Sequence, residues 1–550
     1  MSRPHVLIVG AAGVFGSRLA RLLARRQAYR VSLAGRNEQR VLPLQRELRQ
    51  IDGQGEFSFV HLDRNQVGVE RLREIDCDVV VDCSGPFQTS GTQLIEAAIG
   101  ARCHYIDIAD SRKFVASINR FDSAARAVGV AVISGASSTP GLTHAVLDSI
   151  TSAWLSIDSI DVAIVPGNRT PKGRSVVEAI LSWVGQRVRV FREAGWEHGR
   201  GWGSARWVHI DGLKRRRAML ADVPDLDLIA ARYSPRVRAG FDAGMELPIL
   251  NRLIGLAALP VKWELMPSAR SFTGLGTMIA NLLDGFGTTD GGMLVEVAGQ
   301  DTRGDARVVR WWLKATNGDG PYVPVLAAAA LVEALTHGRA ARVGARPAAG
   351  MVSLEQIRPW LDGLAIETKQ MAFRGEKPLF RRAMGEAFDR LPEVTQRLHR
   401  GRPAIVAQGE AVVAPAEGGP ASLMAGWLGL PREAGRVPVR VVIESRDGSE
   451  RWTRFFADRA MRSVMSLADG GLVEERFGPV AIRLRLIARK DGLDMHAISG
   501  RVWGVPLPKF LLPRIKGEER VDEGGRHRFE VEIDAPIFGR LVAYRGYLMV

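Results

Sequence analysis

Cysteine is scarce in this chain of 550 residues, which contains only Cys77, Cys83 and Cys103. The three do not form a C-x-x-C pair, and we therefore expect no metal site. They fit small core residues of a protein in a reducing compartment. Because the first expected strand begins at His5, we expect no secretion signal ahead of it, and the sequence predicts a cytoplasmic protein.

Long apolar runs are also missing. The nearest candidate, Leu247–Val261, is interrupted by Asn251, Arg252 and Pro260 and is too short to span a bilayer. Two interpretations of this segment stay open: it is a core or interface segment, or it lies on a membrane surface.

Several catalytic signatures are absent as well. There is no Walker A sequence, no H-E-x-x-H and no G-x-S-x-G, so nothing indicates a nucleoside triphosphatase or a hydrolase. None of the six tyrosines is followed by lysine four residues later. That absence excludes the Tyr-Lys proton relay of short-chain dehydrogenases.

Acidic residues are fewer than basic residues. The chain has 60 Asp and Glu residues and 75 Lys and Arg residues, which gives a formal net charge of +15. The densest basic run, Lys214–Arg217, is not accompanied by a nucleic-acid recognition motif. We therefore expect no nucleic-acid partner. A solvated basic face and contact with an anionic membrane surface are the interpretations that stay open.

The most informative motif lies near the N-terminus, where the apolar run His5–Val9 leads into a G-x-x-G-x-x-G turn at Gly10–Gly16. A helical pattern with leucines on one face, Ser17–Arg26, follows at once. In this context a glycine turn binds a dinucleotide, with the pyrophosphate at the N-terminus of the helix. The cofactor-binding residues expected in the turn are Gly10, Ala12, Gly13, Val14, Phe15 and Gly16.

The second expected strand, Tyr29–Ala34, indicates which dinucleotide binds. No acidic residue that could hold the ribose 2′-hydroxyl of NAD occurs before Asn37. Arg36 can instead pair with a 2′-phosphate through its planar guanidinium. The sequence therefore predicts NADP(H), with Arg36 and Asn37 at the cofactor.

Strands and helices alternate regularly up to about residue 150, which predicts an α/β fold with a doubly wound parallel sheet of the Rossmann type. Further strands are expected at Phe57–His61, Asp78–Cys83, Cys103–Ile108 and Val130–Ser134, and helices at Val67–Glu74, Thr89–Ile99 and Arg112–Ala127. Ligands bind such sheets at the carboxyl ends of the strands. We therefore expect Asp63 near the adenine end of the cofactor, and Ser84, Gly85, Pro86 and Phe87 near the nicotinamide ribose.

Three side chains near the same strand ends are candidates for proton transfer: Asp107, Asp110 and His144. Each has a structural alternative, such as a capping role for Asp110 or a packing role for His144. A helix is expected to start at Thr139–Gly141, and the loop before it is expected to lie against the nicotinamide.

The expected domains are residues 1–150, 151–365 and 378–550. In the middle region we expect strands at Asp161–Val165, Met293–Ala298 and Arg307–Ala315, and a helix at Val325–Thr336. In the last region, Asp-Gly turns at Arg446–Gly448 and Lys490–Gly492 separate runs of alternating polarity. That pattern predicts a β-rich domain: either a curved antiparallel sheet around an apolar pocket, or a β-sandwich that only packs against the rest.

Four segments, 6–16, 34–37, 81–87 and 104–107, together resemble the saccharopine dehydrogenase family of NADP-binding proteins, and the resemblance covers about residues 1–365. It implies a Rossmann domain, an inserted α/β substrate domain with a mixed sheet, and a helix that returns to the first domain. It also implies NADP-linked oxidoreduction. Members of the family act on amino-acid and polyamine imines, and some relatives act on lipids.

The C-terminal region resembles a bacterial domain of unknown function, of the DUF4166 type. The resemblance is carried by residues 391–392, 451–455, 475–479 and 505–508. It implies no activity.

Our main hypothesis is an NADP(H)-dependent oxidoreductase that transfers a hydride to or from a C=N, C=O or C=C group of a small-molecule substrate. The apolar segments Leu247–Val261 and Ile279–Leu283 favour a hydrophobic, lipid-like substrate and a role in lipid metabolism. The alternative is a protein that senses NADP(H), or binds lipid or membrane, without turnover. A homodimer and a peripheral position at the inner membrane surface stay open.

Overall fold

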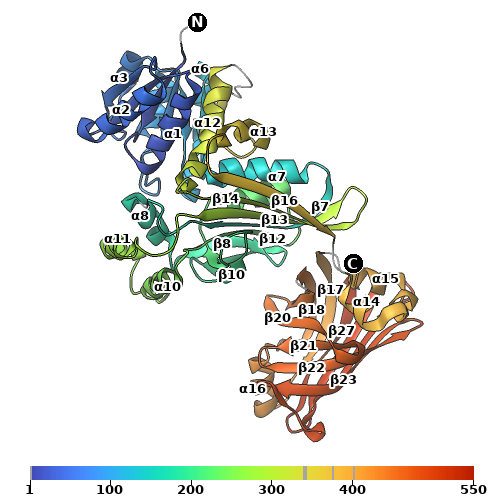
Figure 1. Ribbon diagram of the computed structural model, residues 1–550. Helices are drawn as coiled ribbons and strands as arrows, with labels where there is room; N and C mark the ends of the chain where they lie inside the picture. The colour runs from blue at the N-terminus through green and yellow to red at the C-terminus, as the bar shows by residue number, and fades with distance from the viewer. Residues whose placement is uncertain (1–2, 172, 338–342, 375–376, 401–402, 447) are drawn as a thin grey trace.

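The structure, a computed structural model, describes residues 3–171, 173–337, 343–374, 377–400, 403–446 and 448–550. Three regions follow one another along the molecule, each built on its own sheet (Figure 1). The N-terminal and C-terminal regions lie at opposite ends, and the middle region separates them.

The N-terminal sheet is parallel, with the strand order β3-β2-β1-β4-β5-β6-β15. Its strands are β1 (His5–Val9), β2 (Arg30–Gly35), β3 (Phe57–His61), β4 (Val79–Asp82), β5 (His104–Asp107), β6 (Ala131–Ser134) and β15 (Gly344–Pro347). The order reverses between β1 and β4, and such a switch point is where doubly wound sheets bind ligands. The predicted Rossmann-type fold class is therefore confirmed.

Helices cover both faces of this sheet. They are α1 (Val14–Arg26), α2 (Leu42–Ile51), α3 (Val69–Ile75), α4 (Gln93–Gly100), α5 (Arg112–Ser117), α6 (Asp122–Val128) and α12 (Val323–Thr336), whereas α7 (Thr143–Thr151) packs on the middle sheet and α13 (Leu354–Ile357) packs against α12 and α7. The α1 helix buries Leu19 and Leu23 completely, because they repeat at helical spacing on its inner face. The apolar α12 helix returns from the middle region, packs beside α1, and is buried along most of its length.

The middle sheet is mixed, in the order β10-β11-β12-β7-β13-β14-β16, with β8 beside β12 and β9 beside β8. Its strands are β7 (Trp154–Val165), β8 (Arg187–Arg192), β9 (Gly195–Arg200), β10 (Ala205–Val208), β11 (Arg216–Leu220), β12 (Arg238–Ala243), β13 (Gly291–Asp301), β14 (Ala306–Ala315) and β16 (Ile366–Arg374). The β7–β12 pair is parallel and its neighbours pair antiparallel. The predicted strands at 161–165, 293–298 and 307–315 are confirmed, and β16 carries the sheet past residue 365.

Four helices belong to this region: α8 (Arg174–Trp183), α9 (Asp225–Tyr233), α10 (Pro248–Lys262) and α11 (Thr273–Leu282). Figure 1 shows α8, α10 and α11 gathered at one edge of the region, below the N-terminal sheet. The predicted apolar segment 247–261 is thus a helix, α10, and most of its side chains are only partly buried.

The C-terminal region is an antiparallel sheet that closes on itself, because β22 pairs with both β21 and β23. The strands are β17 (Ala404–Pro415), β18 (Gly435–Arg446), β19 (Ser449–Phe456), β20 (Arg459–Ala468), β21 (Leu472–Phe477), β22 (Val480–Arg489), β23 (Gly492–Val502), β24 (Val505–Pro506), β25 (Arg514–Val521), β26 (His527–Ala535) and β27 (Gly539–Met549). The helices α14 (Leu379–Met384), α15 (Glu393–Leu398) and α16 (Gly419–Trp427) pack against it. The predicted curved sheet is confirmed, and both hairpins form where expected, although Asp447 itself lies outside the described residues.

Polar contacts join the C-terminal region to the middle sheet. The carboxylate of Asp158 in β7 accepts hydrogen bonds from Arg236 at 2.7 Å and from the backbone N–H of Ala404 at 3.2 Å. Glu193, between β8 and β9, pairs with Arg462 of β20 at 2.7 Å. The carboxylates of Asp158 and Glu193 are buried, whereas Arg236 and Arg462 are partly exposed, so these contacts join the two regions at the border of the solvent.

Two predicted helices differ from the structure. The helix expected at 112–127 is broken by a 3-10 turn at Ile118–Phe121, which places Asp122 where its carboxylate accepts a hydrogen bond from Ala345 N in β15 at 2.9 Å. The helix expected from Thr139 begins one turn later, at Thr143, after a wider turn over Ser138–Leu142. Both differences arise from tertiary contacts that periodicity does not register.

Candidate functional site: two cavities that meet

Two glycines in the turn between β1 and α1, Gly10 and Gly16, lie where an added Cβ would clash. Gly10 has a φ of +78°, and a Cβ there would lie 2.9 Å from Cβ of Ser84. A Cβ at Gly16 would lie 2.4 Å from the carbonyl oxygen of Gly10, so Gly16 allows the close contact between turn and helix. Gly13 is the N-cap of α1 and leaves the helix end without a side-chain cap. A helix end of this kind attracts anions.

A cavity of about 1200 Å³ extends along the carboxyl ends of the N-terminal strands and continues against the middle region. Of the predicted cofactor-binding residues, Gly10, Ala12, Gly13, Val14, Phe15, Arg36, Asn37, Asp63, Ser84, Gly85, Pro86 and Phe87 line it. Gly16 does not line the cavity but supports the turn from behind. This volume exceeds the range of about 300–1,000 Å³ that is usual for ligand pockets, so it leaves room for a dinucleotide.

The side chain of Arg36 lies at the rim of this cavity and is exposed. It makes no ion pair with any residue that the structure describes. Arg40, on the 3-10 turn Glu38–Arg40, is exposed on the same rim. Two guanidinium groups that are not ion-paired to the nearby Glu38 would hold a 2′-phosphate. The sequence analysis did not predict that Arg40 lies at the cofactor cavity. Its position four residues after Arg36 could have indicated this.

A buried acid positions the loop after β4. Asp82 is fully buried, and its carboxylate accepts hydrogen bonds from the backbone N–H of Ser84 at 2.9 Å and from the Ser84 hydroxyl at 2.5 Å. Arg64 pairs with the other oxygen of Asp82 at 2.9 Å and reaches Ser90 Oγ at 2.5 Å. This ion pair fixes the Ser84–Phe87 loop at the cavity wall, so Arg64 is a positioning residue that sequence reasoning missed.

The three proton-transfer candidates lie in different places. Asp110 lines the cavity and is exposed, and its carboxylate accepts a hydrogen bond from Gln88 at 3.0 Å. Asp107 is fully buried behind the strand ends and is not part of the cavity wall. His144 is also fully buried; its ring stacks on Tyr233 at 5.3 Å, and its Nε2 lies 3.6 Å from Asp225.

Asp107 instead joins three backbone segments. One carboxylate oxygen accepts hydrogen bonds from Ala109 N at 2.9 Å, Gly135 N at 2.8 Å and Ser134 Oγ at 2.9 Å. Burial raises the pKa of Asp107 to about 7, although these hydrogen bonds oppose the shift. Asp107 therefore shapes the turn after β6 from behind and does not face a ligand in the cavity.

That turn brings two hydroxyl groups to the cavity. Ser138 and Thr139 both line it, and the buried Thr139 Oγ1 has no hydrogen-bond partner among the described residues. The buried side-chain oxygen of Gln88, on the same wall, is equally without a partner in the described part of the chain. Unpaired buried polar groups are rare in folded proteins. A polar ligand fits these atoms, and the sequence indicated only the loop, not the two hydroxyl groups.

A second, apolar cavity of about 540 Å³ opens beside the first. It lies between α8, α10 and α11 and the edge of the middle sheet. The two cavities share lining residues, among them Phe15, Ser138, Ile164, Val176, Met245 and Pro324. Among the described residues, no charged side chain lines the second cavity, and its polar side chains are those of Ser138 and Thr170.

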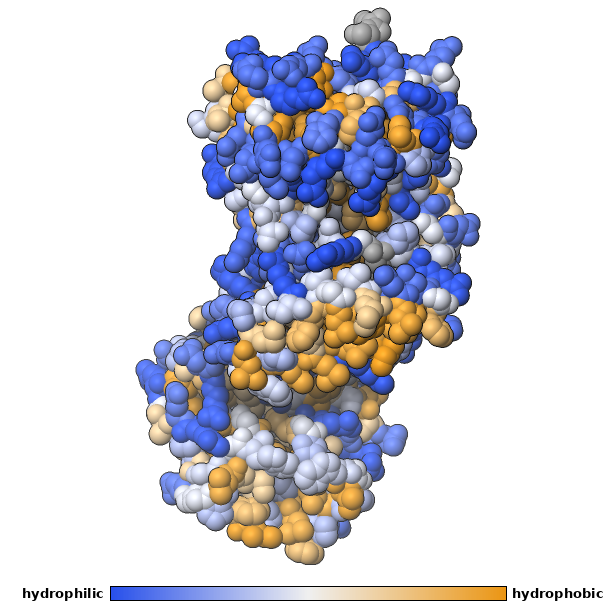
Figure 2. All heavy atoms as spheres, turned by 90° about the vertical axis from the view of Figure 1, so that its left-hand side faces the viewer, coloured by the Kyte–Doolittle hydropathy of each residue, from blue (hydrophilic) through white to orange (hydrophobic). Residues whose placement is uncertain are grey.

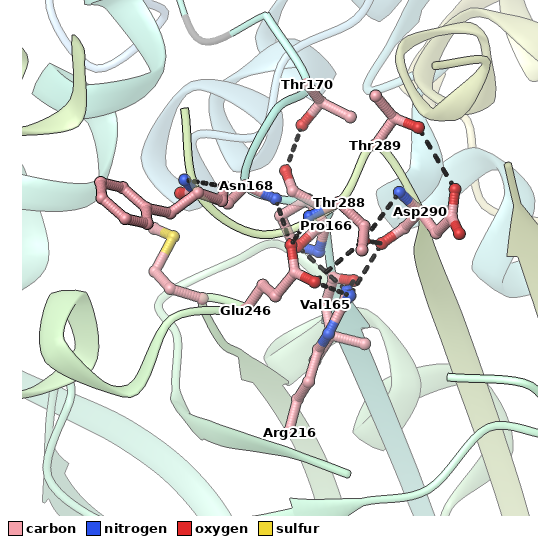
Figure 3. A network of polar contacts seen from close by, with 12 residues as sticks. Val165, Pro166, Asn168, Thr170, Arg216, Glu246, Thr288, Thr289 and Asp290 are labelled. Atoms are coloured by element: carbon pink, nitrogen blue, oxygen red, sulfur yellow. Dashed lines mark hydrogen bonds and ion pairs between the residues drawn. The ribbon is translucent and has the colours of Figure 1, made fainter. Parts of the chain in front are cut away.

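A polar network holds the loops that border the apolar cavity near Pro166 and Thr170 (Figure 3). The buried Arg216 pairs with Glu246 at 3.0 Å and donates to the carbonyl oxygen of Val165 at 2.8 Å. Glu246 also accepts hydrogen bonds from Asn168 N at 2.7 Å and Thr288 N at 2.9 Å. Burial opposes ionisation of Glu246, but these donors outweigh it and lower its pKa. The network connects the end of β7 to the loop after α11, and so holds in place the loops that border the cavity.

Together, the doubly wound sheet, the glycine turn and the large cavity at the switch point define a dinucleotide-binding domain. The middle region, which adjoins this domain, supplies the wall of the apolar cavity. No cluster of His, Cys, Asp and Glu that could hold a metal occurs among the described residues.

Comparisons with sequence families identify this domain further. Residues 6–133 match the saccharopine dehydrogenase NADP-binding domain, and residues 391–548 match a domain of unknown function, DUF4166. The first match is to an NADP-binding domain, so the predicted cofactor, NADP(H), is confirmed for the N-terminal region. No curated protein matches the chain in sequence.

Solved structures that match the chain include saccharopine dehydrogenase (L-Glu forming) from Saccharomyces cerevisiae, with 13% identity and a TM-score of 0.48; the match covers 67% of this chain and all of that one. YwfH, an NADPH-dependent reductase of bacilysin biosynthesis, has 13% identity and a TM-score of 0.21 over 24% of this chain and 76% of its own. A metagenomic short-chain oxidoreductase in complex with NADP has 18% identity and a TM-score of 0.20 over 24% of this chain and 81% of its own.

Within the described residues, no helix is long and apolar enough to cross a bilayer.

Proposed function

We propose that this protein is an NADP(H)-dependent oxidoreductase whose substrate carries a large apolar group. One observation carries the proposal: the cavity lined by the glycine turn and Arg36 adjoins a second cavity whose walls are almost wholly apolar. A bound dinucleotide and an apolar molecule would meet where Ser138 and Phe15 line both cavities.

NADPH, when bound, supplies a hydride, which a C=O, C=N or C=C group of the substrate can accept. The chain's own contribution is to orient the two molecules and to exclude water. Phe15, Ile164 and Val176 make the shared wall apolar, and a substrate held against them loses its hydration shell.

The walls of the second cavity argue against an amino-acid imine as substrate. Such a molecule carries carboxylates, and a buried carboxylate needs a cationic partner or several hydrogen bonds. Among the described lining residues, only Ser138 and Thr170 have polar side chains, and none is basic. A long alkyl chain or an isoprenoid group matches the same walls without any unpaired charge.

For proton transfer, Asp110 is our candidate among the three predicted acids and bases, because it lines the cavity whereas Asp107 and His144 do not. The hydroxyl groups of Ser138 and Thr139 lie on the same wall and would orient the reacting polar group.

A second candidate function is binding of NADP(H) and an apolar ligand without turnover. It is favoured by the burial of Asp107 and His144, because the cavity then lacks a histidine among its described lining residues. Activity measurements separate the two candidates.

The test is NADPH oxidation with homologous aliphatic ketones, enones and imines of increasing chain length. Burial of each added CH₂ contributes about 0.8 kcal/mol, so kcat/KM is expected to rise about threefold to fourfold per CH₂ until the apolar cavity is full. Amino-acid-derived imines are expected to react poorly. NADPH binding without turnover of any member would overturn the oxidoreductase proposal and leave the second candidate.

A further inference from the structure

The surface over α10 and α11 is unusually apolar for a face that is open to solvent. Its exposed large apolar side chains are Ile249, Leu256, Trp263, Leu265, Leu275, Met278, Leu282 and Phe286. Leu282 is 76% exposed, Leu265 74% and Trp263 62%. We call this set the α10–α11 face. Scattered exposed apolar residues need no explanation, but a contiguous set of this size marks an interaction site.

The α10–α11 face is also poor in charge. Between residues 247 and 286 the charged residues are Arg252, Lys262, Glu264, Arg270 and Asp284. They are about one residue in eight, half the 25% of the whole chain. Figure 2 shows the result as an apolar band across the lower part of the middle region.

The face surrounds the opening of the apolar cavity. Leu256 of α10 and Leu275 of α11 are more than half exposed, and both also line the cavity. Apolar surface therefore continues without a break from the outside of these helices to the inside, where Ile254 and Ile279 line the wall. A long apolar substrate entering here would stay in contact with apolar atoms along the whole path.

We propose that the α10–α11 face docks on the surface of a lipid bilayer, so that the cavity opens into the acyl region and takes its substrate from there. The substrate part of this inference rests on the proposed function, whereas docking does not. A protein or a second copy of the chain seated on the same face would cover Leu256 and Leu275 and close the opening. A bilayer is the occupant that covers the face and at the same time supplies apolar molecules to it.

The charge and the aromatic residues around the face suit a bilayer. The chain carries a formal charge of +15, which attracts it to anionic lipids, and Arg252 and Lys262 are exposed on α10 itself. Trp263 follows at the end of the same helix, and tryptophan is the residue that prefers the level of lipid headgroups. The face also carries two exposed acidic residues, Glu264 and Asp284, so the three basic residues leave it with a small positive excess.

A second exposed apolar group lies on the same side of the molecule, at the far end of the C-terminal region (Figure 2). There Trp427 of α16 lies 5.8 Å from Trp503, ring to ring, and Phe510 is 75% exposed. Both groups lie on the side that carries α10, α11 and α16 in Figure 1.

Vesicle sedimentation tests this inference on the full-length protein with NADPH present. The probes are vesicles of phosphatidylcholine alone and of phosphatidylcholine mixed with phosphatidylglycerol. The test variant is the double substitution Leu265→Glu and Leu282→Glu, two exposed residues that do not line either cavity. The control is Leu155→Glu, which introduces one carboxylate, against two in the test variant, at a residue that is 68% exposed at the start of β7.

The wild type and the control are expected to bind the anionic vesicles, and the double variant to bind at least about tenfold more weakly. NADPH affinity and reduction of a short, water-soluble ketone are expected to be unchanged in all three, which shows that the variants are folded. Absence of vesicle binding by the wild type, or equal binding by the double variant, would overturn docking. So would a dimer of the wild type in sedimentation velocity that the double variant abolishes.

The two proposals fail in different ways. If the vesicles bind as expected but no carbonyl, imine or enone is reduced, the docking surface stands and the proposed oxidoreductase function falls. If soluble ketones are reduced but vesicles are not bound, the function stands and docking falls.

Discussion

The two neighbouring cavities of this protein are built by opposite means. The cavity at the N-terminal strand ends is formed mainly by turns: backbone N–H groups, glycines and the guanidinium groups of Arg36 and Arg40. The cavity beneath α10 and α11 is formed by aliphatic side chains on helices and strands. The first offers charge and hydrogen bonds to a ligand of known charge, and the second offers shape and apolar surface.

This difference explains what each cavity can discriminate. Hydrogen bonds and ion pairs reject a ligand that lacks one partner, so the first cavity can separate NADP(H) from NAD(H). Apolar walls discriminate weakly, because each CH₂ contributes only about 0.8 kcal/mol. We therefore expect a strict cofactor and a range of substrates, and substitutions in one cavity should leave the ligand of the other unaffected.

The largest effect is expected for Gly13→Asp at the N-cap of α1. A carboxylate there would meet the pyrophosphate, and two like charges near 4 Å repel by about 4 kcal/mol at an intermediate dielectric. NADPH affinity should fall by more than about 100-fold in a fluorescence titration. Gly13→Ala adds only a Cβ, 3.1 Å from the carbonyl oxygen of Gly10, and should cost far less. Equal losses for Ala and Asp would mean that steric fit, not charge, controls the turn.

Arg36→Asp is the next test, because it addresses the choice between cofactors. Loss of the ion pair to a 2′-phosphate should weaken NADPH binding by about 10- to 100-fold while NADH binding stays within about twofold. The same titration checks both ligands. Arg49→Asp, an exposed residue of α2 away from the cavity, is the matched charge control. A parallel loss of NADPH and NADH affinity in Arg36→Asp would contradict the assigned role.

Gly276→Phe is expected to fill part of the apolar cavity and to leave the cofactor cavity unchanged. Gly276 lines it, and a Cβ there would already lie 3.3 Å from Val177, so a phenyl ring would occupy the space meant for substrate. Overpacking of this kind costs about 1–3 kcal/mol, and we expect kcat/KM for long-chain substrates to fall about tenfold or more at unchanged NADPH affinity. Gly274→Phe, in the same helix with open space around it, controls for helix effects.

Asp107→Asn should leave both cavities nearly unaffected and change only how stability depends on pH. Because burial raises the folded-state pKa of Asp107 from 3.8 to about 7, its protonated form contributes stability below pH 4 that is lost as the pH rises through 7. The wild type should therefore lose stability relative to the Asn variant between pH 4 and pH 8, by about 1 kcal/mol or more. Urea unfolding of both proteins at the two pH values measures the difference. A constant difference would show that Asp107 titrates normally.

The cofactor cavity was largely predictable from sequence because its residues follow strand ends in order. The glycine turn, Arg36 and the Ser84–Phe87 loop each come directly after an apolar run, and parallel strands bring such loops to one edge. Asp107 also lies at the end of a strand. The pattern of polar and apolar residues along that strand could not predict that its carboxylate turns inward and accepts hydrogen bonds from backbone N–H groups. His144 lay on a correctly expected helix, whose buried face was not predicted.

The apolar cavity was not predictable to the same degree. Its walls come from α8, α10, α11 and β13, which are far apart in the sequence and show nothing but ordinary apolar character. The sequence did single out 247–261 as an unusual apolar segment, but only the structure places it beside the shared wall. The strand β15 and the closure of the C-terminal sheet were likewise missed or left open, because both depend on pairings between distant segments.

The most direct test of the account is deuterium transfer between the two cavities. Wild-type protein would be mixed with NADPH that carries deuterium at both hydrogen positions of nicotinamide C4 and with long-chain ketones, enones and imines, and the masses of the products would be measured by mass spectrometry. We predict one deuterium in the reduced product for the wild type and for Gly274→Phe, and strongly reduced product for Gly276→Phe, although all three bind NADPH. If the wild type binds NADPH and no apolar acceptor gains deuterium, the two cavities do not form one active site and the central claim is wrong.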